Sequence, residues 1–120
     1  MLKNNIKVTQ NFLTRSSVIN KIISKTSINK KDNLIEIGPG KGHITQQLIK
    51  RCNSVTAIEL DTKLYNKLQI KFNGNKSVCL KNINILNYNL PKSKDYKVFS
   101  NIPFNITTKI VNKLLFDSNP

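Results

Sequence analysis

The spacing of hydrophobic residues alternates between two patterns along the chain. From Ser16 to Ser24, apolar residues recur at helical spacing, which predicts an amphipathic helix. The run Leu34-Ile35-Glu36-Ile37 is mostly apolar at consecutive positions, as in a strand that is buried on both faces. A glycine-rich turn ends this run, and Ile44, Leu48 and Ile49 then mark one face of a second helix. The first part of the pattern is therefore helix, strand, turn and helix.

The same alternation continues through the rest of the chain. The further predicted elements are a strand over 55–60, a helix over 64–72, strands over 78–80 and 97–101, and an amphipathic helix over 106–115. Alternating strands and helices predict an α/β fold with a parallel sheet and helices on both faces. In such a sheet, ligands bind beyond the carboxyl ends of the strands.

Charge adds a candidate partner to this fold. Twenty Lys and Arg residues against six Asp and Glu residues give a formal net charge of +14, which favours a polyanion such as nucleic acid. A bias toward Lys and Asn from an AT-rich genome would produce the same composition without function. No apolar run approaches a membrane span, no apolar signal region follows Met1, and Cys52 and Cys79 form no metal-ligand pair. We therefore expect a cytoplasmic protein with no metal site.

The glycine-rich turn is the first candidate for ligand chemistry. Gly38, Gly40 and Gly42 are spaced G-x-G-x-G after the predicted strand. Glycines let the backbone turn sharply and approach a ligand closely. The spacing matches neither the dinucleotide fingerprint nor a P-loop, because position 43 is His and no G-K-[ST] follows. Taken alone, the motif fits a tight strand-to-helix turn equally well.

An acidic residue at the end of the next strand strengthens the interpretation. Glu59 lies where a carboxylate accepts hydrogen bonds from both ribose hydroxyls of a nucleoside. Asp61 could serve equally well, or the acid could simply be exposed at a strand end. Together, the glycine turn and the acid indicate a nucleoside cofactor.

A third candidate follows the fourth predicted strand, in the run Asn101-Ile102-Pro103-Phe104. Asn101 offers an oxygen that accepts from an amino group, the Pro103 carbonyl lies beside it, and Phe104 offers a flat ring for stacking. Such a run is usually only a turn. Its place at a strand end, beside the glycine turn, indicates a site for an exocyclic amine.

Four runs in order carry a family resemblance: Gln10-Asn11-Phe12-Leu13, Glu36-Ile37-Gly38-Pro39-Gly40-Lys41-Gly42-His43, Val55-Thr56-Ala57-Ile58-Glu59-Leu60-Asp61 and Asn101-Ile102-Pro103-Phe104-Asn105. The chain resembles the Erm methyltransferases, which modify 23S ribosomal RNA and give resistance to macrolide, lincosamide and streptogramin B antibiotics. Dimethyladenosine transferases of small-subunit ribosomal RNA share most of this pattern. The Gly-Lys-Gly-His and Asn-Ile-Pro sequences favour the Erm branch.

The resemblance implies a Rossmann-like S-adenosylmethionine-dependent methyltransferase fold that transfers a methyl group to adenine N6. Residues 1–120 would be the N-terminal part of the S-adenosylmethionine-binding catalytic domain, truncated after the fourth strand and the following helix. The C-terminal helical RNA-binding domain would be absent. The implied partner is ribosomal RNA, most simply 23S, with no membrane, and the full-length protein would be monomeric.

The resemblance also implies roles for individual residues at the cofactor. Asn11 and Leu13 would lie across the cofactor, and Gly38 and Gly40 would hold its methionine end. Glu59 would bind the ribose. Asn84 stands where the family usually has Asp facing the adenine amino group, so its amide oxygen would accept that bond without a charge.

At the target base, Asn101 and the Pro103 carbonyl would accept the N6 hydrogens, with Asn101 also close to the cofactor. Phe104, where tyrosine is more common, would stack on the flipped adenine. Lys3, Lys7 and Arg15 are candidates for RNA contact.

Two other functions remain open on the residues. One is a related methyltransferase that acts on DNA or protein glutamine. Against it, Ile rather than Pro follows Asn101, and the run at 10–13 is present. The other is a non-enzymatic, basic RNA-binding module that keeps the glycine turn as scaffold.

Overall fold

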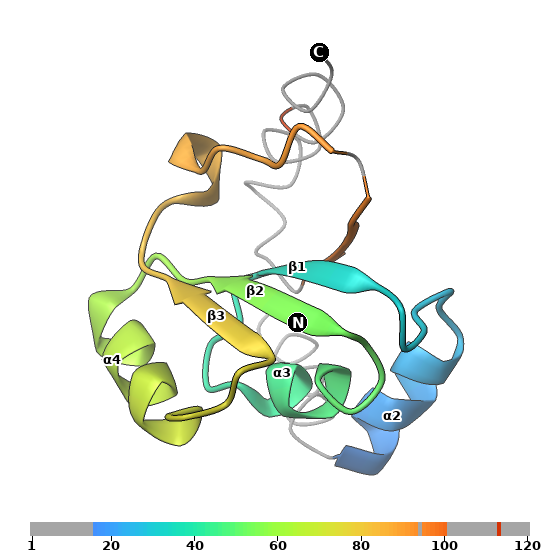
Figure 1. Cartoon of the computed structure of the whole chain (residues 1–120). Helices are drawn as coiled ribbons and strands as arrows, with labels where there is room; N and C mark the ends of the chain where they lie inside the picture. The colour runs from blue at the N-terminus through green and yellow to red at the C-terminus, as the bar shows by residue number, and fades with distance from the viewer. Residues whose placement is uncertain (1–15, 94, 101–112, 114–120) are drawn as a thin grey trace, which may run out of the picture.

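A parallel sheet forms the centre of the molecule. The structure, a computed structural model, describes residues 16–93, 95–100 and 113. Its strands are β1 (Asn33–Ile37), β2 (Ser54–Ile58), β3 (Val78–Lys81) and β4 (Lys97–Ser100). They lie in the order β3-β2-β1-β4, and every neighbouring pair is parallel (Figure 1). The α/β parallel sheet predicted from the sequence is confirmed.

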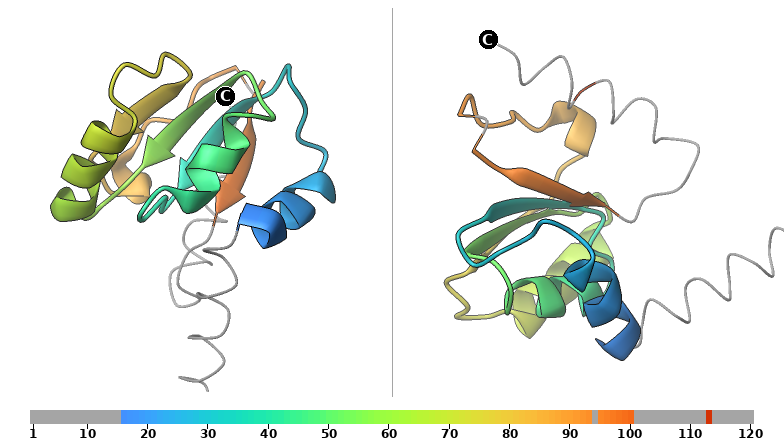
Figure 2. Two further views of the ribbon diagram at one scale, coloured as in Figure 1. Left: turned by 90° about the horizontal axis from the view of Figure 1, so that it is seen from below. Right: turned by 90° about the vertical axis from the view of Figure 1, so that its right-hand side faces the viewer.

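Three helices lie on one face of this sheet: α2 (Ser16–Ser24), α3 (His43–Leu48) and α4 (Thr62–Lys71) (Figure 2). Their apolar sides close a core with alternate residues of the central strands, because successive strand side chains point to opposite faces. The buried members of this core are Ile19, Ile23, Leu34, Ile44, Leu48, Cys52, Val55 and Ala57.

The opposite face of the sheet has a second, smaller core. Ile35, Ile37 and Ile58 point to this side and pack against Ile85 of the short 3-10 helix η1 (Ile85–Asn87). Side chains between residues 83 and 98 complete the cover. The predicted helix over 106–115, which would belong to the cover of a second face, lies outside the described residues except for Lys113. The Lys113 ammonium donates to the Leu86 carbonyl at 3.2 Å.

Element boundaries differ from the prediction by one or two residues. Strand β2 ends at Ile58, two residues before the predicted end. Strand β4 is described up to Ser100, and its predicted end at Asn101 lies outside the described residues. Helix α4 begins two residues early, because Asp61 caps it by accepting from the Leu64 amide at 3.1 Å. The short helix η1 was not predicted. A three-residue 3-10 turn is too short to produce a hydrophobic period.

Two absences concern the described residues. Within 16–93, 95–100 and 113, no helix is long and apolar enough to cross a membrane, and no group of three metal-binding side chains comes together. Both cysteines are free thiols; Cys52 is buried in the core and Cys79 is exposed on β3.

Candidate functional site

The glycine turn joins β1 to α3 at the carboxyl edge of the sheet. Gly38, Gly40 and Gly42 all have positive φ values of 72°, 59° and 86°, a region that side chains other than glycine rarely adopt. The Gly38 amide donates to the Ile58 carbonyl at 3.0 Å, which fixes the turn to the end of β2. The three glycines are therefore required by the backbone path itself.

Gly40 and Gly42 face different surroundings. A Cβ atom added at Gly42 would lie 2.9 Å from Phe72 and 3.0 Å from Leu68, so this glycine allows α4 to pack against the turn. A Cβ atom at Gly40 would meet nothing within 4 Å. The open side of the turn is thus at Gly40, where a ligand could approach the backbone.

Glu59 follows β2 and is bonded to the open part of the turn. Its Oε1 accepts from the Gly40 amide at 3.0 Å, and its Oε2 accepts from the Asp61 amide at 2.9 Å. The side chain is nearly buried, with 7% of its surface exposed. Because each carboxylate oxygen can accept a second hydrogen bond, Glu59 keeps acceptor capacity for a diol while its position is fixed.

Asp61 has a different role from Glu59. Its carboxylate caps α4 at the Leu64 amide and is exposed. The sequence left the choice between these two acids open, and the hydrogen bond to the glycine turn makes Glu59 the better candidate acceptor, which stays a prediction. Between them, Leu60 is 64% exposed, which is high for a large apolar residue. Leu60 was not among the candidate residues predicted from the sequence, although its position as an apolar residue between two strand-end acids was a usable signal.

Asn84 lies just beyond the end of β3, the neighbour of β2. Its Oδ1 accepts from the Leu86 amide at 2.9 Å and so caps η1. Nearby, the side-chain nitrogen Nδ2 of Asn82 donates to the backbone carbonyls of Glu59 and Leu60 at 3.0 and 3.2 Å. These bonds tie the ends of β2 and β3 together, so Asn84 and Glu59 belong to one edge of the sheet.

Glu36 is a further acidic group, which lies beneath the turn and was not among the site residues predicted from the sequence. It lies inside β1, is 2% exposed, and accepts a hydrogen bond from the Thr45 hydroxyl of α3. The pKa of Glu36 is raised to about 7, chiefly by burial; the Thr45 hydrogen bond opposes this rise, and the nearby charge of Glu59 adds to it. An acid within an apolar strand run was the signal in the sequence.

His43 begins α3 directly after the turn. Partial burial, followed by the charges of Lys71 and Lys41, lowers the pKa of His43. This lowering favours the neutral form of the imidazole.

The structure brings Gly38, Gly40, Glu59 and Asn84 to the carboxyl edges of β1, β2 and β3. Asn11, Leu13, Asn101, Pro103 and Phe104 lie outside the described residues, as do Lys3, Lys7 and Arg15. Ser100, the residue before Asn101, pairs with Ile37, the residue before Gly38. The described part of β4 therefore ends beside the start of the glycine turn.

A shallow groove of about 500 Å³ lies elsewhere, between the end of α4 and the start of β3. Phe72, Asn73, Lys76 and Val78 are among the residues that line it. It is formed at the amino end of β3, whereas the glycine turn and Glu59 lie at the carboxyl ends. The groove is therefore separate from the candidate site.

A glycine turn after the first strand and an acid after the second, at the carboxyl edge of a parallel sheet, are typical of the α/β class of nucleoside-binding folds. The chain belongs to the ribosomal RNA adenine dimethylase family, whose model matches residues 1–120. The resemblance identified from the four sequence runs is thereby confirmed.

Individual relatives agree with this family. The rRNA adenine N-6-methyltransferase of Limosilactobacillus reuteri is 48% identical over 118 residues, covering 98% of this chain and 48% of that protein. Among solved structures, the 23S rRNA methyltransferase ErmE has a TM-score of 0.76 and 28% identity, covering 84% of this chain and 41% of that one. A Haemonchus contortus phosphoethanolamine N-methyltransferase, solved with S-adenosylhomocysteine, shares the fold at a TM-score of 0.74 and 15% identity, covering 91% of this chain and 23% of that one. The chain thus spans about half the length of the curated relative.

Proposed function

We propose that this chain binds S-adenosylmethionine at the carboxyl edge of its sheet and contributes to methylation of adenine N6 in ribosomal RNA. The observation that carries the proposal is the hydrogen bond between Glu59 and the Gly40 amide, which joins the acid and the open turn into one site. The family, and the cofactor product in one fold neighbour, support the choice of nucleoside.

The residues present fit this cofactor. Glu59 has acceptor capacity for the ribose hydroxyls, and the space at Gly40 lets a ligand approach the backbone. The exposed side chain of Leu60 offers an apolar surface for the adenine ring. Asn84 would accept from the adenine amino group, and Asn11 and Leu13 would lie across the cofactor. When bound, the cofactor supplies an electrophilic methyl group.

The target adenine would be held by the run that follows β4. Adenine N6 is a weak nucleophile, because its lone pair is delocalised into the ring. Asn101 and the Pro103 carbonyl would accept the N6 hydrogens as the nitrogen becomes tetrahedral, while Phe104 stacks on the ring. This is catalysis by positioning and electrostatic stabilisation, without a strong general base.

Within the family we favour 23S ribosomal RNA as substrate, and with it macrolide, lincosamide and streptogramin B resistance for the full-length protein. The Gly-Lys-Gly-His and Asn-Ile-Pro sequences and the structural similarity to ErmE support this branch. We place the protein in the cytoplasm as a monomer, with residues 1–120 as the N-terminal part of the catalytic domain. Small-subunit ribosomal RNA is the alternative substrate.

A methyl-transfer assay tests the proposal. Because the chain spans about half of its relatives, residues 1–120 are also joined to the C-terminal half of the Limosilactobacillus reuteri relative. Labelled S-adenosylmethionine is offered with transcripts of 23S or small-subunit ribosomal RNA, and the modified nucleoside is identified. We expect N6-methyladenine in 23S RNA.

Each other outcome has a distinct meaning. Transfer only to the small-subunit RNA would support the alternative substrate. RNA binding without calorimetric binding of S-adenosylmethionine would contradict the proposal and support a non-enzymatic module.

A further inference from the structure

The chain segments at the starts of β1 and β2 are joined by hydrogen bonds, and they form one surface at the amino edge of the sheet. The Asn53 amide donates to the Asp32 carbonyl at 2.8 Å. The Asn33 side-chain oxygen accepts from Asn53 and from the Ser54 hydroxyl, each at 2.8 Å. Since the strands are parallel and Asn33 pairs with Ser54, both segments lie opposite the edge that carries the glycine turn.

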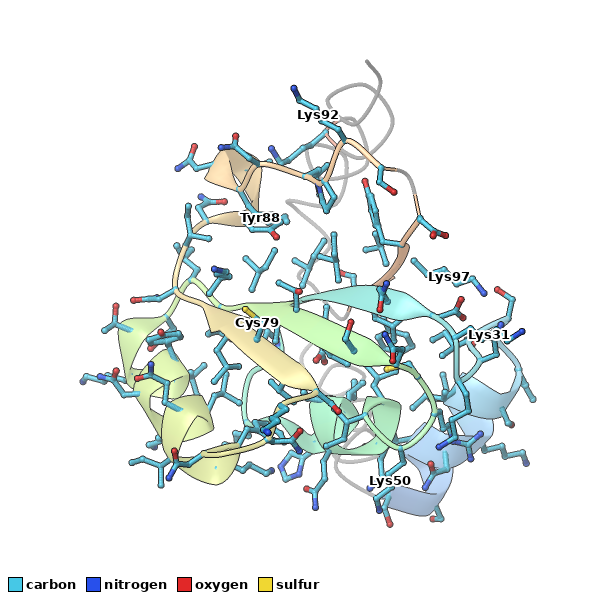
Figure 3. The ribbon with its side chains drawn as sticks, in the orientation of Figure 1. Lys31, Lys50, Cys79, Tyr88, Lys92 and Lys97 are labelled. Atoms are coloured by element: carbon cyan, nitrogen blue, oxygen red, sulfur yellow. The ribbon has the colours of Figure 1, made fainter. Side chains whose placement is uncertain are left out.

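Four cations are displayed by these segments, and we call them the amino-edge patch: Lys30, Lys31, Lys50 and Arg51. The lysines are exposed and Arg51 is half-buried. The Lys30 ammonium donates to the Lys50 carbonyl, so residues distant in sequence are neighbours here. Figure 3 shows Lys31 and Lys50 on the side of the molecule near α2, away from the ends of β2 and β3.

The carboxylate within these segments is already paired. Asp32 accepts from the Lys97 ammonium at 2.7 Å, and this is the ion pair found among residues 16–93, 95–100 and 113. The hydrogen bond from Lys97, with a backbone bond from Asn29, lowers the pKa of Asp32. The charge of Asp32 is thus balanced by Lys97, and the patch keeps its excess of positive charge.

Part of this charge has a local role, because cations near the end of a helix stabilise its last carbonyls. Lys50 and Arg51 follow α3, and Lys30 donates to a carbonyl there. That role would be met by one cation. Four cations interspersed with the amide and hydroxyl groups of Asn33, Asn53 and Ser54 are instead suited to phosphate and sugar contacts.

The distribution of apolar side chains favours RNA over a membrane surface. Peripheral membrane binding places large apolar residues beside the cations. The exposed large apolar residues among those described are Ile22, Leu60, Ile70 and Leu86, and none belongs to the two segments that carry the patch.

We propose that the amino-edge patch is a second contact surface for the phosphate backbone of ribosomal RNA, on the edge of the sheet opposite the nucleoside site. This inference rests on the proposed function. A structured ribosomal RNA is large enough to reach beyond the target base, and lysine and arginine contacts to phosphate add affinity without sequence information.

The test compares two triple variants that each remove three positive charges. The first is Lys31→Gln, Lys50→Gln and Arg51→Gln, which leaves the bond from Lys30 to the Lys50 backbone intact. The matched control is Lys63→Gln, Lys67→Gln and Lys76→Gln, three exposed lysines on and after α4. The Kd for a 23S ribosomal RNA transcript is measured at several salt concentrations, and folding is compared by thermal melting.

We expect the patch variant to lose about tenfold or more in RNA affinity. The slope of log Kd against log salt concentration should fall by about 2 to 3, because each lost phosphate contact lowers this slope by about 0.7 to 0.9. The control should change far less. Calorimetric binding of S-adenosylmethionine should be the same in all three proteins. If the patch triple melts early, Lys31→Gln alone against Lys63→Gln alone gives the same comparison on a smaller scale.

Equal losses in the two triples would overturn the inference, because the charge would then act only through the overall field. Tighter binding of the parent protein to phosphatidylserine vesicles than to RNA, removed by the patch triple, would also overturn it. Loss of S-adenosylmethionine binding in the parent protein is a different result, which contradicts the proposed function itself.

Discussion

The carboxyl and amino edges of the sheet differ in how they hold charge. At the carboxyl edge, Glu36 and Glu59 are buried and each accepts a hydrogen bond, from Thr45 and from the Gly40 amide respectively. At the amino edge, the cations of the patch are mostly exposed, and the carboxylate of Asp32 is paired with Lys97. A parallel sheet makes this separation possible, because all its strands begin at one edge and end at the other.

The difference indicates what each edge can do. Buried, fixed acceptors suit a small ligand whose hydroxyl and amino groups must be matched individually. Exposed lysines suit a polyanion, whose affinity comes from many interchangeable contacts. Substitutions at the carboxyl edge should therefore have specific effects, while those at the amino edge should depend on salt.

The largest expected effect is on the chemistry of the carboxyl edge. Asn101→Ala should lower methyl transfer by about 10³-fold, the scale seen when one electrostatic contact to a reaction centre is removed. The Kd for S-adenosylmethionine should change little in comparison. Single-turnover methylation and calorimetry measure the two quantities, and near-normal turnover would show that Asn101 does not hold the target amine.

A second substitution tests whether Gly42 is needed only for its positive φ, or also because a side chain there would clash with α4. Gly42→Ala places a Cβ 2.9 Å from Phe72 at a φ of 86° and should lower the free energy of unfolding by about 2 to 5 kcal/mol. Gly74→Ala is the control, because it has a similar φ of 79° but no atom within 4 Å.

The control should cost only about 1 to 2 kcal/mol for backbone strain. Denaturant unfolding measures both variants. Equal losses would mean that the contact between the turn and α4 contributes nothing.

The acid beneath the turn should make stability depend on pH. The pKa of Glu36 rises from 4.5 to about 7 on folding, so the folded protein keeps a proton that the unfolded chain has lost between these values. The free energy of unfolding should therefore fall as pH rises through this window, by up to about 3 kcal/mol.

Glu36→Gln should remove this dependence while keeping an acceptor for Thr45, and it should be the more stable protein at pH 8. Urea unfolding at several pH values gives the comparison. An unchanged slope in Glu36→Gln would show that the pH dependence does not come from a raised pKa of Glu36 in the folded protein.

Much of this architecture could be predicted from the sequence, for identifiable reasons. The strand around Leu34 and Ile35 was predictable because burial on both faces requires consecutive apolar residues. The glycine turn was predictable because three positive φ values require glycine. In both cases one local requirement determines the residue type.

The functions of individual polar side chains could not be read in this way. Glu59 and Asp61 are both acids at the end of a strand, and only the hydrogen bonds to Gly40 and to Leu64 distinguish them. The amino-edge patch combines segments twenty residues apart, as the contact between Lys30 and Lys50 shows. Such pairings depend on tertiary structure and leave no local pattern.

The smallest effect concerns the adenine end of the cofactor. Asn84 has one acceptor oxygen, and the Leu86 amide already occupies one of its two lone pairs. In Asn84→Asp, a second oxygen and a charge become available to an amino group, so the Kd for S-adenosylmethionine should fall by about three- to tenfold.

Asn82→Asp is the matched control. It adds the same charge nearby but loses the donor to the carbonyls of Glu59 and Leu60, so it should not tighten binding. Calorimetry of both variants is the measurement, and no tightening in Asn84→Asp would argue against a contact with the amino group.

The most direct test of a nucleoside site at the carboxyl edge is calorimetric binding of S-adenosylmethionine to Glu59→Gln and Asp61→Asn. Each variant removes one negative charge from neighbouring positions, and asparagine still caps a helix. We predict that Glu59→Gln weakens binding by about tenfold or more, since hydrogen bonds to a charged acceptor are worth about 1.5 to 3 kcal/mol, and that Asp61→Asn binds nearly as the parent protein does. Equal affinities in the two variants would contradict the assignment of Glu59 as the ribose acceptor, and with it the proposed site.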